Sequence, residues 1–319
     1  MHFSFYIFFM LRGMKRLLGN LFVALFVVFS PSCYIDEENS SITSAAKAEW
    51  SKVYEYMPAP GQFINDTTPS GGGFDGTQTT HDKAIAYAET RLSKKLYVSL
   101  GGFGGYIVVG FDHNVANTSS DDFAIMGNPN ATSSEPGIVW VMKDENENGL
   151  PDDTWYELAG SETGQPTTIR NYAVTYYRPS APKMAVKWSD NQGHSGEINY
   201  IESQHSQEYY YPLWVETESY TLTGTCLEAR NEQSADGLNW TLLPYGWGYA
   251  DNFSSEDFFA GNRENENRFD ISNAIDADGK GVKLGHINFV KVQCAVNAQS
   301  GHLGEVSTEV CSFRDLNIY

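Results

Sequence analysis

The chain is poor in cysteine and in basic residues, and beyond residue 29 it has no apolar run of membrane-spanning length. Four cysteines in 319 residues are too few for a scaffold held together by disulfide bonds. Only 21 lysines and arginines stand against 40 aspartates and glutamates, giving a formal net charge of −19. A nucleic-acid-binding protein needs a cationic face to replace phosphate counterions, so this charge argues against that class.

Common catalytic motifs are also missing. The chain has no Gly-x-Ser-x-Gly sequence, which is the usual signature of a serine nucleophile at a strand-to-helix turn. The glycine-rich segment 101–105 precedes an expected strand rather than a helix, which excludes a dinucleotide-binding loop. The histidines beyond the leader lack the spacing of zinc ligands; they are His81, His113, His194, His205, His286 and His302.

The N-terminal segment has the pattern of a lipoprotein signal. A short basic stretch precedes the apolar residues 17–29, which are too few for a spanning helix. The run ends at Ser30-Pro31-Ser32-Cys33, which predicts a signal peptide over residues 1–33 with Cys33 as the lipidated residue. The acidic residues 36–38 resemble the export signal of some Gram-negative surface lipoproteins. A plain secretory peptide with an incidental cysteine is the alternative.

The rest of the chain has the pattern of an all-β protein on a tether. Residues 34–48 are small and polar, as expected of a linker, and residues 49–319 are rich in short segments of aromatic and β-branched residues. The spacing predicts one helix over residues 80–94, with Thr80 as its cap. Expected strands are 96–100, 106–111, 123–126, 138–142, 155–158, 172–178, 184–188, 225–230 and 287–294.

This order of elements favours an antiparallel β-sandwich or jelly roll with long loops and one short N-terminal helix. One large domain over residues 49–319 is the simpler organisation, and two sandwiches are the alternative. The remaining cysteines are Cys226, Cys294 and Cys311. Cys294 and Cys311 are the preferred disulfide pair, and three buried free cysteines are the alternative.

An acidic turn resembles the first half of a calcium-binding loop. Oxygen-bearing side chains alternate at Asp144, Asn146 and Asn148 before Gly149, so they can curl around a hard cation. The EF-hand pattern then fails, because position twelve is Trp155. We expect a structural Ca²⁺, and a solvated acidic turn is the alternative. The predicted ligands are Asp144, Asn146, Asn148, the Leu150 carbonyl, Asp152, and Asp153 or Glu157.

Two aromatic segments are candidates for ligand binding. Rings in loops rich in glycine and proline can present flat faces to a sugar or a macrocycle. Burial of the same rings in the core is the competing interpretation. The candidate ligand-binding residues are Tyr210, Trp214, Trp240, Tyr245, Trp247 and Tyr249.

Residues 54–65, 99–112 and 303–310, together with the segment 144–157, resemble a family of bacterial "cell surface protein" lipoproteins, some found with PKD-type domains. The resemblance implies a place at the cell surface near outer-membrane uptake systems, including those for cobalamin. We therefore expect a non-catalytic outer-membrane lipoprotein that binds a small molecule or glycan and passes it to an outer-membrane transporter. Its lipid is the expected membrane attachment.

Two other functions remain open at this point. The first is a calcium-dependent polysaccharide hydrolase, with acids among Asp112, Asp121 and Asp122, because paired carboxylates can cleave glycosides. The second is a structural or adhesive surface module, in which the aromatic loops would form an exposed apolar patch.

Overall fold

A computed structural model describes residues 46–68, 73–203, 207–261 and 265–318. The predicted signal peptide, its Cys33 and most of the predicted tether lie outside the described residues. In the described part of the chain, no helix is long and apolar enough to cross a membrane.

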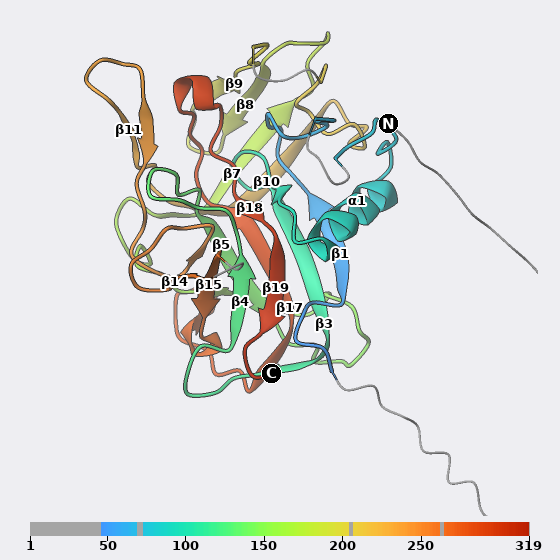
Figure 1. Ribbon diagram of the computed structural model, residues 1–319, viewed down its shortest axis with the longest axis vertical. Helices are drawn as coiled ribbons and strands as arrows, with labels where there is room; N and C mark the ends of the chain where they lie inside the picture. The colour runs from blue at the N-terminus through green and yellow to red at the C-terminus, as the bar shows by residue number, and fades with distance from the viewer. Residues whose placement is uncertain (1–45, 69–72, 204–206, 262–264, 319) are drawn as a thin grey trace, which may run out of the picture. The chain divides into compact units, whose positions relative to one another are not determined.

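The central element is a seven-stranded antiparallel sheet (Figure 1). Strand β17 (His286–Cys294) lies in its middle and pairs with β3 (Tyr106–Ala116) on one side and β5 (Gly137–Met142) on the other. Beyond β3 lies β1 (Lys52–Met57). Beyond β5 follow β6 (Trp155–Leu158) and β16 (Ala274–Ile275), while β13 (Tyr249–Ala250) pairs with another part of β5.

Two four-stranded antiparallel sheets accompany this sheet. The first has the order β14 (Phe258–Ala260), β15 (Asn265–Phe269), β4 (Phe123–Met126), β19 (Ser312–Asp315). The second, at the top of Figure 1, has the order β10 (Ser219–Cys226), β7 (Ile169–Tyr177), β8 (Val186–Asp190), β9 (Ser195–Ile198). Two ribbons pair β11 (Asn231–Gln233) with β12 (Trp240–Leu242) and β2 (Val98–Ser99) with β18 (Glu309–Val310).

The main core lies between sheets because alternate residues of each strand point to opposite faces. Val290 and Val292 of β17 are fully buried, in the same cluster as Phe123 of β4 and Phe313 of β19. Lys291 lies between the two valines and therefore faces the other side of the sheet. There, β10 approaches closely, since a Cβ at Gly224 would overlap the side-chain amide of Gln293. The fold is an all-β sandwich, which confirms the predicted fold class.

The one α-helix of the described residues, α1 (His81–Ser93), packs against β1 (Figure 1). Thr80 caps it as predicted, because its hydroxyl accepts a hydrogen bond from the backbone N–H of Lys83. Ala88 and Leu92 are buried, so the predicted apolar face is the packing face.

Two local predictions are wrong. The strand expected over residues 225–230 instead ends at Cys226, because the chain leaves β7 there and the Leu227 N–H bonds the carbonyl of Ala295. The expected disulfide between Cys294 and Cys311 does not form; both cysteines are free and buried, as is Cys226. The Cys294 thiol donates instead to the Val306 carbonyl at 3.4 Å.

Candidate functional site

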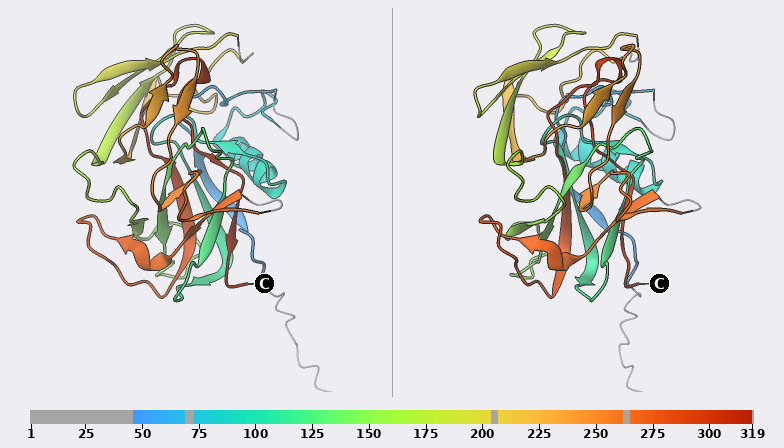
Figure 2. Two further views of the ribbon diagram at one scale, coloured as in Figure 1. Left: turned by 60° about the vertical axis from the view of Figure 1, so that its left-hand side comes forward. Right: turned by 90° about the vertical axis from the view of Figure 1, so that its left-hand side faces the viewer.

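A cavity of about 330 Å³ lies where segments distant in the sequence meet. One side is formed by the 3₁₀ helix η2 (Gly301–Leu303) and the residues that follow it. Figure 2 shows this segment beside the β11–β12 hairpin, and Asn231 donates to the Ser300 hydroxyl at 2.6 Å. We call this cavity the acidic pocket. Its lining includes Gln62, Phe63, Ser133, Glu135, Leu242, Ser300, His302, Leu303, Gly304, Glu305 and Glu309.

Glu305 has an unusual position in the acidic pocket. Its side chain is only 3% exposed. One carboxylate oxygen, Oε1, accepts a hydrogen bond of 2.8 Å from the Gln62 N–H. The other oxygen, Oε2, is buried and has no hydrogen-bond partner. Burial raises the pKa of Glu305 to about 8, against the opposing effect of the Gln62 N–H. A buried polar atom without a partner costs about 1–3 kcal/mol, so a ligand group that reached Oε2 would relieve this cost.

Glu309 and Glu135 bring two more carboxyl groups to the acidic pocket. Glu309 lies in β18 and accepts a short hydrogen bond from the Asn128 side-chain amide. Burial raises the pKa of Glu309 to about 7, although Asn128 and Arg91 act in the opposite direction. Glu135 is half-buried and accepts a bond of 3.0 Å from the Ser307 N–H.

The carboxyl groups of this region also repel one another. Burial raises the pKa of Glu135 well above its usual value, and the charges of Glu309 and Asp251 raise it further. Asp251 lies behind the pocket, where its carboxylate accepts from the N–H groups of Glu309 at 2.8 Å and Asn128 at 3.0 Å. Carboxyl groups held partly protonated near neutral pH can donate as well as accept hydrogen bonds, and such groups concentrate at functional sites.

The sequence did not reveal this pocket. Glu305 and Glu309 lie in a segment that carries the family resemblance, but the resemblance implies no role for either glutamate. A signal was present, because Glu305 and Glu309 stand among small and β-branched residues that favour a buried extended segment. That signal does not identify Gln62, Asn128 or Glu135 as neighbours, since they come from distant parts of the chain.

The predicted ligand-binding aromatics are mostly core residues. Tyr210, Trp214, Tyr245 and Tyr249 are at most 6% exposed, so they present no face to a surface ligand and the expectation is wrong for these four. Trp240 and Trp247 are half-buried, and neither lines the acidic pocket. The three buried tyrosines are tolerated because their hydroxyls find partners inside, as Tyr245 does at the Glu228 carbonyl at 2.7 Å. The indole N–H of Trp214 is buried without a partner.

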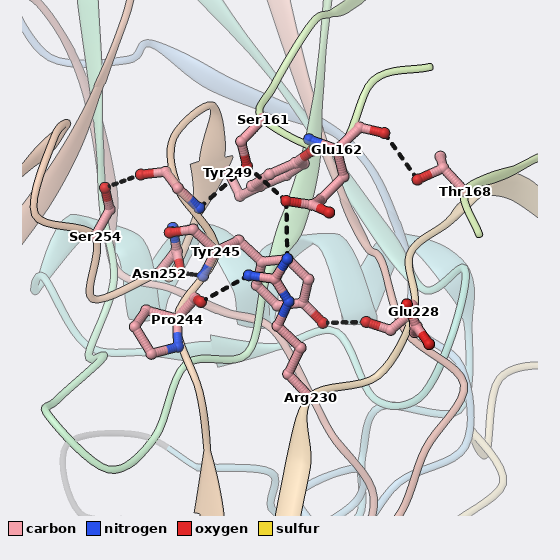
Figure 3. Close-up of polar contacts among 11 residues, drawn as sticks. Ser161, Glu162, Thr168, Glu228, Arg230, Pro244, Tyr245, Tyr249, Asn252 and Ser254 are labelled. Carbon is pink, nitrogen blue, oxygen red and sulfur yellow. Dashed lines mark hydrogen bonds and ion pairs between the residues drawn. The ribbon is translucent and has the colours of Figure 1, made fainter. Parts of the chain in front are cut away.

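Figure 3 shows how the segment around Tyr245 is fixed. The Arg230 guanidinium lies over the Tyr245 ring, 4.3 Å from its centroid, and forms an ion pair of 3.0 Å with Glu162. The same guanidinium donates to the Pro244 carbonyl at 3.0 Å, and the Tyr249 hydroxyl accepts from the Glu162 N–H at 2.9 Å. This network anchors the chain just after Leu242, which lines the acidic pocket.

The predicted calcium loop is curled as expected around Asp144. Its carboxylate accepts from the N–H groups of Asn148 at 3.1 Å and Gly149 at 2.8 Å. Asp152 accepts from the Asn148 amide at 3.0 Å. In this arrangement the side-chain amide nitrogens of Asn146 and Asn148 face the Asp152 carboxylate. Both side chains would have to turn before their amide oxygens could face a cation at that position.

Other predicted ligands of this loop are less favourable. Glu157 points elsewhere, because its carboxylate accepts from the Thr225 hydroxyl at 2.6 Å; its prediction as a loop ligand is wrong. Asp153 accepts from the Glu145 N–H at 2.8 Å, and Leu150 is exposed. Among the described residues, no group of three or more His, Cys, Asp or Glu side chains is arranged to hold a metal. Calcium therefore stays a prediction that depends on the two asparagines.

Calcium addition tests the loop. If Ca²⁺ binds, a concentration a hundredfold above the dissociation constant should raise the melting temperature by roughly 5 °C, because binding to the folded state alone stabilises it. The Asp144→Ala variant should lose this increase. Asp278→Ala, which removes an exposed acid from another turn, is the matched control and should keep it. If neither Ca²⁺ nor a chelator changes the melting temperature of the unmodified chain, the loop is an ordinary acidic turn.

The acids considered for hydrolysis lie away from the acidic pocket. Asp122 is fully buried and accepts from the N–H groups of Thr118 at 2.7 Å and Ile271 at 2.9 Å, so it braces two loops. Asp112 is exposed and contacts His113 at 2.8 Å. Asp121 is exposed. These contacts give the three carboxylates no shared cavity.

Comparison with known proteins adds no functional information: no protein-family model matches the chain, and no curated protein matches it.

Proposed function

We propose that this protein binds a small polyhydroxylated molecule, of the size of one or two sugar rings, in the acidic pocket without changing it chemically. The observation that carries the proposal is the buried, unpartnered Oε2 of Glu305 in a cavity that also contains Glu135 and Glu309. With the predicted lipid on Cys33, the protein would act at the cell surface and pass its ligand to an outer-membrane transporter.

The chemistry of the pocket supports a sugar-like ligand. Hydroxyl groups donate and accept hydrogen bonds, which suits carboxyl groups that are partly protonated near neutral pH. Phe63 and Leu303 add apolar surface for the carbon faces of a ring. The volume of about 330 Å³ is at the lower end of the range for small-molecule sites. It therefore suits one or two rings better than a macrocycle.

Calorimetric titration of the full chain with a panel of monosaccharides and disaccharides tests this proposal. At pH 9, where most of the Glu305 carboxyl group is ionised, a binding sugar should lose about tenfold or more in affinity to the Glu305→Gln variant, because the amide Nε2 cannot accept a hydrogen bond from a hydroxyl group. Glu232→Gln, an exposed substitution on β11, is the control and should bind normally. Equal affinity for the two variants would contradict the proposal, and so would a panel without any binding sugar.

A hydrolase is the second candidate, and the pair Glu305 and Glu309 favours it. Their pKa values are raised to about 8 and about 7, and two carboxyl groups with raised or separated pKa values are the machinery of glycoside hydrolysis. The test is to incubate the protein with a panel of polysaccharides and to measure the release of reducing ends. Release that the Glu309→Gln variant abolishes would show that the function is catalysis rather than binding. The candidate acids are then those of the acidic pocket rather than Asp112, Asp121 and Asp122.

A further inference from the structure

A second cavity, of about 210 Å³, lies on the other face of the central sheet. Its floor is formed by two cross-strand neighbours, Lys291 of β17 and Trp140 of β5. Glu157 of β6 pairs with Trp140 on the other side and lies next to the cavity. Its wall comes from β7 and β10 of the second four-stranded sheet, through Arg170 and Thr225. Trp155 of β6 also lines the cavity. We call it the Trp140–Lys291 site.

The Lys291 ammonium in this site has aromatic neighbours, and no carboxylate of the described residues is bonded to it. Its Nζ lies 4.6 Å from the centroid of the Trp140 ring and 5.1 Å from that of Trp155. In the described part of the chain no oxygen accepts a hydrogen bond from this ammonium, and no carboxylate forms an ion pair with it. Burial lowers the pKa of Lys291 to about 8, although Glu157 acts in the opposite direction. Contact with rings compensates only part of the desolvation of an ammonium.

A second donor in the site is also unsatisfied. The indole Nε1–H of Trp140 is buried and has no hydrogen-bond partner. A buried indole N–H normally finds an acceptor. Trp140 and Lys291 are direct neighbours across the sheet, and both residues line the cavity.

The other charged groups around Lys291 are engaged elsewhere or are neutral. Glu157 accepts from the Thr225 hydroxyl at 2.6 Å and lies 3.7 Å from the Arg170 guanidinium. Arg170 donates to the Asp276 carbonyl at 3.1 Å. From β3, the Tyr106 ring centroid lies 5.9 Å from Nζ, and burial raises the pKa of Tyr106 to about 12, so it is neutral. Lys291 and Arg170 are the basic side chains that line the site, with the buried Glu157 carboxylate beside it. Asp276 also lines the site, and its carboxylate accepts from the N–H groups of Asp278 and Lys280, both at 2.9 Å.

We propose that the Trp140–Lys291 site binds an acidic sugar residue, with its anionic group on the Lys291 ammonium and the Trp140 N–H, and its ring against the indoles. The Trp140 N–H lacks an acceptor and the Lys291 ammonium lacks a bonded anion, and one anionic group can supply both. The indole faces suit the carbon face of a pyranose ring. The volume of about 210 Å³ restricts the ligand to a single ring, terminal or side-chain, carrying a carboxylate or a sulfate.

Calorimetric titrations with glucuronate, a glucose sulfate and neutral glucose test this proposal on the full chain. At pH 7 at least one of the two acidic sugars should bind at least tenfold more tightly than glucose, and comparison of the two identifies the anion. Lys291→Met, which keeps the aliphatic stem, should lower the affinity tenfold or more, and Trp140→Phe should lower it by about threefold. Lys187→Met, an exposed substitution on β8, should change nothing. Equal binding of glucose and both acidic sugars, or unchanged binding by Lys291→Met, would overturn the proposal.

The pH dependence of binding separates a charged contact from a packing effect. Affinity for the acidic sugar should fall several-fold between pH 7 and pH 9 as the Lys291 ammonium loses its proton. Lys291→Arg should bind with little dependence over this range, because a guanidinium stays charged. If the affinity falls to a similar extent in the unmodified chain and in Lys291→Arg, the proposed role of Lys291 is contradicted. Glu305→Gln should retain binding at this site, so failure of the acidic-pocket proposal and failure of this one give different results.

Discussion

Lowering the pH from 8 to 5 should increase the free energy of unfolding, and Glu305 should account for much of the increase. Burial raises the pKa of Glu305 to about 8, whereas the unfolded chain ionises near the ordinary value of about 4.3. Between these two values the folded state holds a proton that the unfolded state releases. The stabilisation is therefore complete below the unfolded pKa and is lost as the pH rises through the folded pKa.

The expected effect is large for a single residue. A full shift of this size corresponds to an upper limit of about 5 kcal/mol, and water entering the pocket reduces it, so we expect about 2 kcal/mol between pH 5 and pH 8. Urea unfolding at pH 5, 6.5 and 8 measures it directly. Glu305→Gln, which imitates the protonated acid, should raise the free energy of unfolding at pH 8 by about 2 kcal/mol and the melting temperature by roughly 5 °C.

The exposed substitution Glu232→Gln again serves as the control and should leave the pH profile unchanged. Part of the slope should persist in Glu305→Gln, because burial also raises the pKa values of Glu309, Glu135 and Asp251. Below about pH 4 the trend should reverse as favourably bonded exposed carboxylates become protonated. A slope that is identical in Glu305→Gln and in the unmodified chain would show that this carboxyl group is ionised in the folded state.

Local patterns in the sequence predicted the local structure well. The expected strands 123–126 and 155–158 coincide with β4 and β6, and Thr80 caps α1, because side-chain alternation and capping depend on residues a few positions apart. The turn around Asp144 was predictable for the same reason. Glu157 was predicted both as a ligand in that turn and as part of the strand 155–158, and these two predictions conflict. In β6 its side chain is placed by the sheet, beside Trp140 and Thr225.

The two cavities could not be derived from local patterns. In a chain with 40 acidic residues, nothing near Glu305 shows that its partner is the backbone N–H of Gln62, 243 positions away. Lys291 is one basic residue within a strongly predicted strand, and its lack of an anionic partner depends on β7 and β10. The aromatic prediction was wrong for a related reason. The hydroxyl of Tyr245 bonds a backbone carbonyl that only the fold brings near, which makes burial favourable.

The glycine-rich segment between β2 and β3 offers the strongest test of the fold. A Cβ at Gly105 would fall well inside van der Waals contact of the Leu100 carbonyl oxygen and of the Ala59 nitrogen. Both are backbone atoms, which cannot move aside as a flexible side chain can. Their hydrogen bond, of 3.0 Å, joins the segment after β1 to the end of β2. Gly105→Ala should therefore cost more than about 4 kcal/mol, at the extreme of single substitutions.

Gly281→Ala is the matched control. Position 281 has no atom within 4 Å of an added Cβ, so the free energy of unfolding should change by less than about 0.5 kcal/mol. Near-ultraviolet circular dichroism and urea unfolding should show Gly105→Ala unfolded or severely destabilised. The same turn places the Gly101 N–H 3.1 Å from the Ser307 hydroxyl, within the segment that carries Glu305 and Glu309. Any folded fraction of Gly105→Ala should therefore bind sugar more weakly than the unmodified chain, and native stability with native binding would refute the close backbone approach.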